Sequence, residues 1–545
     1  MAQLTFHTLH CDVLVIGGGG AAIRAAIACR EKGADALVVS KTRVGFGNNT
    51  YISKATWAVP GVGHPEDTNR VYENDTLVAG CFMNDRKMVE RVARGASGVI
   101  PFFERCGVPF ATRDGRMVID QAPGHTYPRH VRGKNRKGSD LMLPLRAYAE
   151  RIGVRFLERV FVTRLVKNGN RVAAATGLSE DGIFYEIGFQ SAILATGGYG
   201  RIYLRTNNAS GIQGDGQAIA FRLGLPLKDM EFVQFYPTAT GRGGTRLLLY
   251  EVLICREGAR LKNGSGEDIL IKHGLEDPLG LTRDRLARTI MEEVRSGLGI
   301  EGGVIMDLRS LTEQSAATVS PLLPSGWSPS IRELVVAPTA HFCMGGVVVD
   351  SDAQTGIPGL FCAGEVCAGV HGANRLAGNA LLEIFVMGEA AGINAAQSAR
   401  EMDPATADEN EIREEKKRIE SMFSGTGKDA RELCRTLQSV MWDMGGVIRD
   451  GKGLQEALTR IEELRALGRT CMAENAIQLT RRLDLENMLL VSEMVCRAAL
   501  CRIESRGAHY RTDCPQEKNP EWLRNVHIRK GRGESMVMET VPVSH

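Results

Sequence analysis

Residues 11–30 of the sequence read CDVLVIGGGGAAIRAAIACR. The apolar run Cys11–Ile16 predicts a buried strand, the four glycines after it predict a tight turn, and the alanine-rich segment up to Arg30 predicts a helix. A second apolar strand, Ala36–Ser40, follows at the distance expected for a right-handed βαβ unit. The segment therefore predicts an α/β fold that opens as a doubly wound, Rossmann-like sheet.

The glycine turn has the spacing of a dinucleotide-binding motif. Gly17, Gly19 and Ala22 fit G-x-G-x-x-A directly after a strand and at the start of a helix. Free backbone N–H groups at the positive end of the helix dipole can bind a pyrophosphate there. The acidic ribose ligand that usually ends the second strand is replaced by Ser40-Lys41, whose hydroxyl and ammonium can reach the ribose or the phosphates.

Composition narrows the class of protein. The chain has 545 residues, a net charge of +3 and 43% hydrophobic residues, which is enough for several globular domains. Balanced charge and 6% aromatic residues argue against nucleic-acid binding. No run approaches the ~18 apolar residues of a membrane span. The 13 cysteines include no C-x-x-C pair, so we expect buried thiols in a reducing cytoplasm, with neither a metal site nor iron–sulfur ligands in this chain.

The order of patterns along the chain predicts an interrupted nucleotide-binding domain. A polar, turn-rich stretch covers residues 45–140, a β-rich run leads to a second glycine signal near Gly197, and a third strand with a glycine turn ends at Glu365. After residue 403 the chain is charged, with helical periodicity. The predicted units are the discontinuous nucleotide-binding domain (1–224 and 341–402), an inserted domain (225–340), a helical domain (403–505) and a polar tail on the surface (506–545).

Several longer motifs identify a family. They are ATGG (195–198) with GDG (214–216), DMEFVQFYPT (229–238), TRD (282–284), APTAHFCMGG (337–346), AGE (363–365), HGANRL (371–376) and NAL (379–381). In this order and spacing, from about Asp12 to Tyr510, the sequence resembles the flavoprotein subunits of succinate dehydrogenase and fumarate reductase, a family that also includes L-aspartate oxidase.

The resemblance implies FAD as the cofactor, an α+β capping domain for the inserted segment and a helical C-terminal domain. The residues expected to bind FAD are Gly17, Gly19, Gly20, Ala22, Ser40, Lys41, Asn49, Thr50, Ala195, Thr196, Gly197, Asp215, Glu365, Arg375, Asn379, Ala380 and Leu381.

The resemblance also implies a reaction in which hydride passes between flavin N5 and one carbon of an activated double bond. Arg283 matches the family's proton donor, and His341 and Arg375 match residues that hold a substrate carboxylate. Because an arginine is a poor acid, it needs an anionic relay, for which Glu251 is preferred and Glu257 is the alternative. We expect Asp284 to cap a helix and to orient Arg283.

The sequence departs from the family in its substrate pocket. Tyr236 stands where succinate and fumarate enzymes carry a histidine that contacts the second carboxylate, two residues before Thr238, which the resemblance also places in the site. Tyr250 stands where the family usually has threonine. A phenol is neutral and longer than an imidazole, so the size and charge of the pocket change. The second substrate group is therefore not necessarily a simple C4 carboxylate.

A second departure concerns the flavin. Asn49 stands where respiratory members carry the histidine that bonds covalently to FAD, so we expect noncovalent FAD with a lower potential that favours reduction of the acceptor. The family's Glu-Gly-Gly is replaced by Lys54-Ala55-Thr56 in the same loop.

These features predict a cytoplasmic FAD-dependent oxidoreductase of the fumarate reductase and succinate dehydrogenase type, acting on an unsaturated (di)carboxylate or its saturated partner. A separate iron–sulfur subunit is the expected electron-transfer partner, which would allow association with a membrane through partner subunits. One alternative is L-aspartate oxidase. Another is a noncatalytic flavin electron-transfer subunit, against which the joint presence of Arg283, His341 and Arg375 argues.

Overall fold

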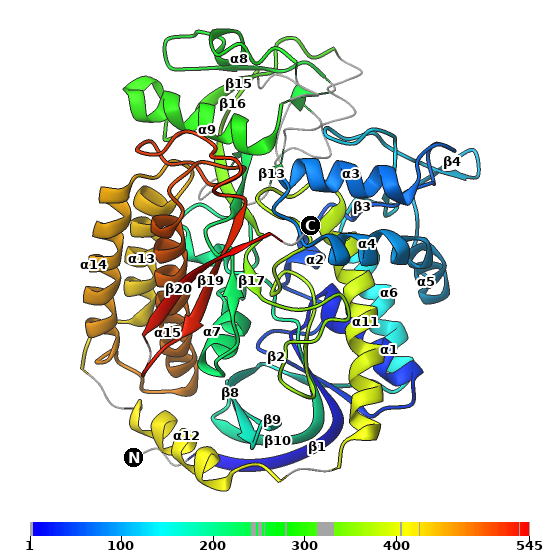
Figure 1. Cartoon of the computed structure of the whole chain (residues 1–545), viewed down its shortest axis with the longest axis vertical. Helices are drawn as coiled ribbons and strands as arrows, with labels where there is room; N and C mark the ends of the chain where they lie inside the picture. The colour runs from blue at the N-terminus through cyan, green and yellow to red at the C-terminus, as the bar shows by residue number, and fades with distance from the viewer. Residues whose placement is uncertain are drawn as a thin grey trace.

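The computed structural model describes residues 4–240, 247–248, 253–255, 257–277, 281–312, 332–403, 406–423, 426–533 and 535–543. Its central sheet has the strand order β7-β2-β1-β10-β9-β8, and β18 pairs with β10 (Figure 1). The bounds are β1 (Thr5–Ile16), β2 (Ala36–Ser40), β7 (Arg155–Glu158), β8 (Val160–Asn168), β9 (Arg171–Ser179), β10 (Ile183–Leu194) and β18 (Leu360–Cys362).

Four parallel strands of this sheet end at one edge. Ile16 of β1 lies beside Val39 of β2 and Leu194 of β10, and Leu194 lies beside Cys362 of β18. The three glycine-containing segments found in the sequence follow β1, β10 and β18, so they meet at that edge although they are far apart along the chain. In open α/β sheets, ligands bind outside the carboxyl ends of the strands.

Helix α1 (Gly20–Glu31) packs against the long helix α11 (Asn379–Glu401), both beside the central sheet. The two backbones come very close, because a Cβ atom on Gly392 would lie 2.3 Å from the carbonyl oxygen of Ala25. Helix α6 (Ser139–Arg151) also contacts α1, and helix α7 (Asp215–Arg222) begins at the second glycine segment. The core of this region consists mainly of alanine, valine, leucine and isoleucine side chains from β1, α1, β2 and α11.

The stretch 45–140 contains more helix than its composition suggested. It forms α2 (Asn49–Ile52), β3 (Thr56–Ala58), α3 (Asn69–Ala79), α4 (Arg86–Gly95), α5 (Val99–Cys106), β4 (Thr112–Arg113), β5 (Arg116–Met117) and β6 (His130–Arg132). Helix α4 shows why the pattern was weak: four residues, Met88, Val89, Val92 and Ala93, are buried among charged neighbours. Such a narrow apolar stripe is easily read as a polar loop.

The inserted segment is built on an antiparallel sheet with the order β13-β12-β16-β15-β14. Helix α9 packs on β12 and β16, and the segment lies at the top of the molecule in Figure 1. Strands β12 and β16 pair antiparallel, with Val233 at the start of β12 beside Cys343 at the end of β16. The bounds are β12 (Val233–Thr240), β13 (Leu247–Leu248), β14 (Arg260–Lys262), α8 (Ile269–Lys272), α9 (Arg283–Glu293), β15 (Val304–Asp307) and β16 (Glu333–Cys343).

The C-terminal region contains the expected helices. Helices α12 (Glu409–Ser421) and α14 (Gly451–Gly468) lie in the stretch after residue 403 that showed helical periodicity. Helices α13 (Ala430–Gly445) and α15 (Ala476–Cys501) pack with α14 into a bundle. The predicted domain limits themselves stay predictions.

Residues 506–545 differ from the surface tail that we expected. They form β19 (Arg524–Lys530) and β20 (Met536–Pro542), and β19 pairs with β11 (Leu227–Lys228) in a sheet that also includes β17 (Gly346–Val347). The side chains of Val526 and Ile528 are fully buried. Alternation of apolar and polar residues over only a few positions is a weak signal, and charged neighbours hid it.

Buried charges attach this C-terminal segment to the rest of the molecule. The Arg502 side chain is fully buried, with Nε 2.6 Å from Glu231 Oε1 and Nη1 3.0 Å from Glu504 Oε1. It also donates hydrogen bonds to the carbonyl oxygens of Trp522 and Arg524, just before and at the start of β19. One guanidinium thus holds three chain segments, and its removal leaves the buried Glu231 carboxylate without its cation, while Glu504 still pairs with Arg506.

We predict that Arg502→Met lowers the free energy of unfolding by about 3–5 kcal/mol, because Glu231 becomes an uncompensated buried charge, whereas Glu504 keeps its ion pair with Arg506. Arg497→Met is the matched control: its half-exposed ion pair with Glu493 is worth less than about 1 kcal/mol. Thermal melting followed by circular dichroism measures both. Equal melting temperatures for the two variants would contradict this role of Arg502.

Candidate active site

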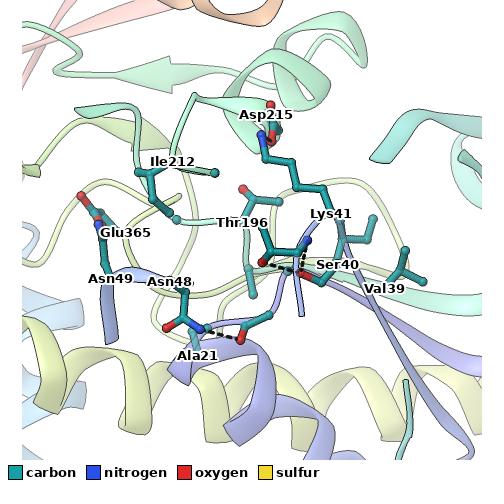
Figure 2. Close-up of a pocket in the computed structure, with 18 of the residues that line it drawn as sticks. Ala21, Val39, Ser40, Lys41, Asn48, Asn49, Thr196, Ile212, Asp215 and Glu365 are labelled. Atoms are coloured by element: carbon teal, nitrogen blue, oxygen red, sulfur yellow. Dashed lines mark hydrogen bonds and ion pairs between the residues drawn. The ribbon is translucent and has the colours of Figure 1, made fainter. Parts of the chain in front are cut away.

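A cavity opens at the edge of the central sheet where the parallel strands end (Figure 2). Its walls come from the β1–α1 turn, the end of β2, the start of α2, and the turns after β10 and β18. The residues expected to bind FAD that line it are Gly17, Gly19, Gly20, Ser40, Lys41, Asn49, Thr50, Ala195, Thr196, Gly197, Asp215 and Glu365.

The backbone of the first glycine turn is shaped for a phosphate group. Gly17 has a φ of +133°, and a Cβ atom there would lie 2.1 Å from the carbonyl oxygen of Ala195, so only glycine fits. Gly19, the N-cap of α1, has no side chain to cap the helix. The Gly20 N–H donates to Thr50 Oγ1 at 3.2 Å, so a ligand in the cavity would use the N–H groups that follow it in the first turn. The buried Thr196 hydroxyl has no hydrogen-bond partner among the described residues. These groups fit the pyrophosphate and hydroxyls of a dinucleotide.

The Lys41 side chain lies in the wall of this cavity and pairs there with two carboxylates. Its Nζ is 2.6 Å from Asp215 Oδ2 and 2.9 Å from Asp484 Oδ1, and Figure 2 shows Lys41 and Asp215 pointing toward each other. Burial lowers the pKa of Lys41, but the two carboxylates outweigh that effect and raise it above its ordinary value. Helix α15, which carries Asp484, therefore contacts the wall of the cavity through this lysine.

Asn49 and Glu365 lie beside each other on the opposite wall (Figure 2). The Asn49 amide donates to Glu365 Oε2 at 3.2 Å and to Asn208 Oδ1 at 3.0 Å, and Glu365 Oε1 accepts from the Cys343 N–H at 3.1 Å. Burial raises the pKa of Glu365 to about 7, and the two hydrogen bonds oppose this only in part. A carboxyl that gains or loses a proton near neutral pH therefore faces the cavity.

The other expected FAD-binding residues lie outside this lining. Ala22 is fully buried within α1, and Asn379, the first residue of α11, donates to Thr76 Oγ1 at 2.9 Å. Ala380 and Leu381 follow Asn379 in the first turn of α11. Arg375 belongs to a second cluster of polar side chains.

This second cluster joins the inserted segment to the central domain. Gln234 Oε1 of β12 accepts hydrogen bonds from Arg283 Nη1 at 3.1 Å and from Arg375 Nη2 at 2.9 Å. Its amide nitrogen donates to Asn374 Oδ1 at 2.8 Å, and the Asn374 amide donates to Asp284 Oδ1 at 2.7 Å. Two guanidinium groups from different parts of the chain thus share one amide oxygen, and such a pair of cations attracts an anion.

His341 and Tyr236 adjoin the two arginines. The ring centroids of His341 and Tyr236 are 5.6 Å apart, and the guanidinium carbon of Arg283 is 5.0 Å from the Tyr236 centroid. His341 Nδ1 is 3.0 Å from the side-chain nitrogen of Asn207. Thr238 is buried, and its hydroxyl has no hydrogen-bond partner among the described residues. The structure therefore brings Arg283, His341, Arg375 and Tyr236 together.

Glu251, the preferred proton relay, and Tyr250 lie outside the described residues, whereas Glu257 lies within them. The choice between Glu251 and Glu257 therefore stays a prediction. Thr282 is the N-cap of α9, and Asp284 lies in the first turn, where it accepts from the Asn374 amide at 2.7 Å and burial raises its pKa. That Asp284 caps the helix and orients Arg283 stays a prediction.

Sequence reasoning missed several residues of these clusters. Asn48 Nδ2 donates to the Gly18 carbonyl at 3.1 Å, and Asn48 Oδ1 accepts from the Tyr51 N–H as the N-cap of α2. Gln234 lies inside the recognised motif DMEFVQFYPT, two residues before Tyr236, so the motif offered a usable signal. Asp484 gave no such signal, because its neighbours in the sequence do not indicate that it contacts Lys41, more than 400 residues earlier in the chain.

Comparison with known proteins agrees with this architecture. A family model described as FAD binding domain matches residues 12–381, and one described as fumarate reductase flavoprotein C-term matches residues 434–545. A fumarate reductase (CoM/CoB) chain of Methanothermobacter marburgensis is 36% identical, over 95% of this chain and 97% of the relative. The L-aspartate oxidase of Pyrococcus horikoshii is 32% identical, over 92% and 95%. The Mycobacterium smegmatis Sdh1 structure in complex with UQ1 is 32% identical with a TM-score of 0.89, covering 99% and 95% of the two chains.

The fold and the cavity define a FAD-dependent oxidoreductase that acts on CH–CH bonds. Within that class, the chain belongs to the family of the fumarate reductase and succinate dehydrogenase flavoprotein subunits. The predicted α/β fold with an inserted α+β segment and a helical C-terminal region is confirmed, as is FAD as cofactor. In the described residues, no helix is both long and apolar enough to cross a membrane.

We predict that the FAD-stripped protein becomes less stable as pH rises from about 4.5 to about 7. The folded protein retains the Glu365 proton over this range, whereas the unfolded chain, with an ordinary pKa of 4.5, has released it. Glu365→Gln, which cannot ionise, lacks this contribution. Melting temperatures of both proteins across the range measure it: the gap should widen in favour of the variant as pH rises. A gap that does not change with pH would refute the assignment.

Proposed function

We propose that this flavoprotein reduces the double bond of an unsaturated carboxylate, with Arg283 as the proton donor. The observation that carries the proposal is the hydrogen bonding of Arg283 and Arg375 to the same Gln234 oxygen. This arrangement directs two fixed cations at one small region, where a carboxylate can bind to one of them and a carbanion can form beside the other.

Each side chain then has a distinct task. When bound, FAD supplies hydride to one carbon of the double bond. Arg375 offers a planar fork for a substrate carboxylate, and His341, held by Asn207, can donate to the same group. Their pull on that carboxylate polarises the double bond. Arg283 stands at the first position of α9 and delivers a proton to the other carbon; Asp284 and Asn374 fix the turn that carries it.

We also propose that electrons reach this flavoprotein from a separate iron–sulfur protein. Support comes from the Methanothermobacter marburgensis relative, which is named as one of the subunits of a fumarate reductase, and from the absence of a C-x-x-C pair in the sequence. Purification from the native source tests this part: an iron–sulfur protein should copurify. A lone flavoprotein that reacts rapidly with oxygen would contradict it.

L-aspartate oxidase is the second candidate function. The Pyrococcus horikoshii relative favours it, and so does Asn49, because this position cannot form the covalent histidine–flavin bond that we expect of respiratory members. Formation of an imine from L-aspartate, with transfer of electrons to oxygen or fumarate, would decide for this activity. Noncovalent FAD is part of both proposals, and it is tested by release of the flavin on denaturation.

We predict that Arg283→Lys retains FAD but loses about 10²- to 10⁴-fold in the rate at which an enoate reoxidises the reduced flavin, because the shorter ammonium cannot keep the geometry of the guanidinium. Anaerobic stopped-flow absorbance measures this with fumarate, then with longer and aryl-substituted enoates. The matched control is Arg288→Lys, one turn further along α9. An unchanged rate in Arg283→Lys would contradict its role as proton donor, whereas wild-type protein whose reduced flavin no enoate reoxidises would favour the noncatalytic electron-transfer role.

A further inference from the structure

The first turn of α7 contacts both the FAD cavity and helix α15. Asp215 and Ile219, on α7, line the cavity. The residue before α7, Gly214, packs so closely on α15 that a Cβ atom there would lie 2.7 Å from Val491 Cγ2. Asn487, one turn before Val491, donates from its amide to Asp215 Oδ1 at 3.0 Å. The residue that begins α7 is therefore held by α15 and also faces the cavity.

The Lys41 ammonium has three partners within the protein. Its Nζ is 2.6 Å from Asp215 Oδ2, 2.9 Å from Asp484 Oδ1 and 2.7 Å from Gln213 Oε1. An ammonium has three N–H groups, so this arrangement leaves none for a ligand in the cavity. Burial, together with the charge of Asp215, raises the pKa of Asp484 to about 6 against the opposing effect of Lys41, so Asp484 is ionised at pH 8.

One face of α15 makes all these contacts. Gln213 Nε2 donates to Met488 Sδ at 3.7 Å, which adds a contact to those of Asp484, Asn487 and Val491. These four residues of α15 follow the spacing i, i+3, i+4 and i+7, which places them on one side of a helix. The side of α15 that meets the cavity wall is therefore built for that wall, and the contact includes polar and apolar groups.

Asp215 supplies a carboxylate that the end of β2 lacks. In dinucleotide-binding folds an acidic residue after the second strand accepts hydrogen bonds from ribose hydroxyls, but Lys41 stands at that place here. Lys41 in turn binds Asp215, which lines the same cavity (Figure 2). Each Asp215 oxygen accepts one hydrogen bond, from Lys41 or from Asn487, and keeps lone pairs for further donors.

We propose that Asp484 is a positioning residue for the cofactor. Through Lys41 it fixes the Asp215 carboxylate where it accepts hydrogen bonds from the adenosine ribose of FAD. Asn487 holds the other oxygen of the same carboxylate. Cofactor affinity thus depends on a helix that contributes no residue to the cavity lining itself. This inference concerns FAD binding and holds whatever substrate the enzyme reduces.

The test measures Kd of the flavin-stripped protein at pH 8 for FAD and for an analogue whose adenosine lacks both ribose hydroxyls. Wild-type protein should bind FAD about 10- to 100-fold more tightly than the analogue, the worth of a charge-assisted hydrogen bond. Asp484→Ala should weaken FAD binding by about tenfold and leave the analogue within about threefold of wild type. Glu486→Gln is the matched control: it lies two residues along α15 in a partly exposed ion pair with Arg418, and it should change neither Kd.

Two further variants separate positioning from folding. Asp484→Glu, which keeps the charge, should retain most of the preference for FAD, and Lys41→Met should reproduce the pattern of Asp484→Ala. Equal weakening of both ligands, or no change in either, would overturn the role of Asp484. Tighter FAD binding by Asp484→Ala would also overturn it, because the released Lys41 would then bind the cofactor directly. Wild-type protein that binds FAD and the analogue equally would exclude Asp215 as the ribose ligand.

Reciprocity between the two sites gives a second measurement. Because Asp484 links the cavity to α15, FAD binding should slow amide hydrogen exchange at residues 484–491 of the wild-type protein. In Lys41→Met, FAD at saturating concentration should no longer slow exchange there. Mass spectrometry of the flavin-stripped and FAD-loaded proteins measures both. The same exchange with and without FAD in wild type would contradict the link.

Discussion

A single amide oxygen, Gln234 Oε1, fixes the two arginines of the proposed active site. It accepts from Arg283 on the inserted segment and from Arg375 on the central domain, so two like charges are fixed near each other by one neutral group. Arginines remain charged when buried, so the pair attracts an anion. In the proposed function a substrate carboxylate binds there, which requires the inserted segment and the central domain to be correctly packed together.

The cofactor site depends on a different constraint, the close approach of backbones at the edge of the central sheet. Gly17 leaves no room for a side chain against the Ala195 carbonyl, so the β1–α1 turn and the turn after β10 form one continuous wall. Lys41 extends that wall to α15 through Asp484. The helical region is therefore part of the support of the cofactor site. The buried Arg502 likewise holds the start of β19, which lies between the bundle and the central domain.

Much of this could be predicted from the sequence, because the decisive signals are local. The strand and glycine turn at residues 11–20, and the motifs around Arg283, His341 and Arg375, need only a few neighbours to be recognised. The features that sequence reasoning missed depend on partners that are distant along the chain. Strand β19 alternates over too few residues to stand out without β11 beside it, and Asp484 has no significance until α15 lies against Lys41. The positive φ of Ala55, +48°, is likewise not evident from the sequence, because the turn is held by hydrogen bonds from residues 133 and 138.

The central claim is that Arg375 and His341 bind a substrate carboxylate while Arg283 faces a carbon of the substrate double bond. A crystal structure of the FAD-loaded protein with an unreactive saturated dicarboxylate tests it most directly. The account predicts one carboxylate within hydrogen-bond distance of both Arg375 and His341, with a carbon of the substrate between the flavin and the Arg283 guanidinium. A dicarboxylate bound elsewhere, or guanidinium groups directed away from it in an ordered complex, would contradict the account.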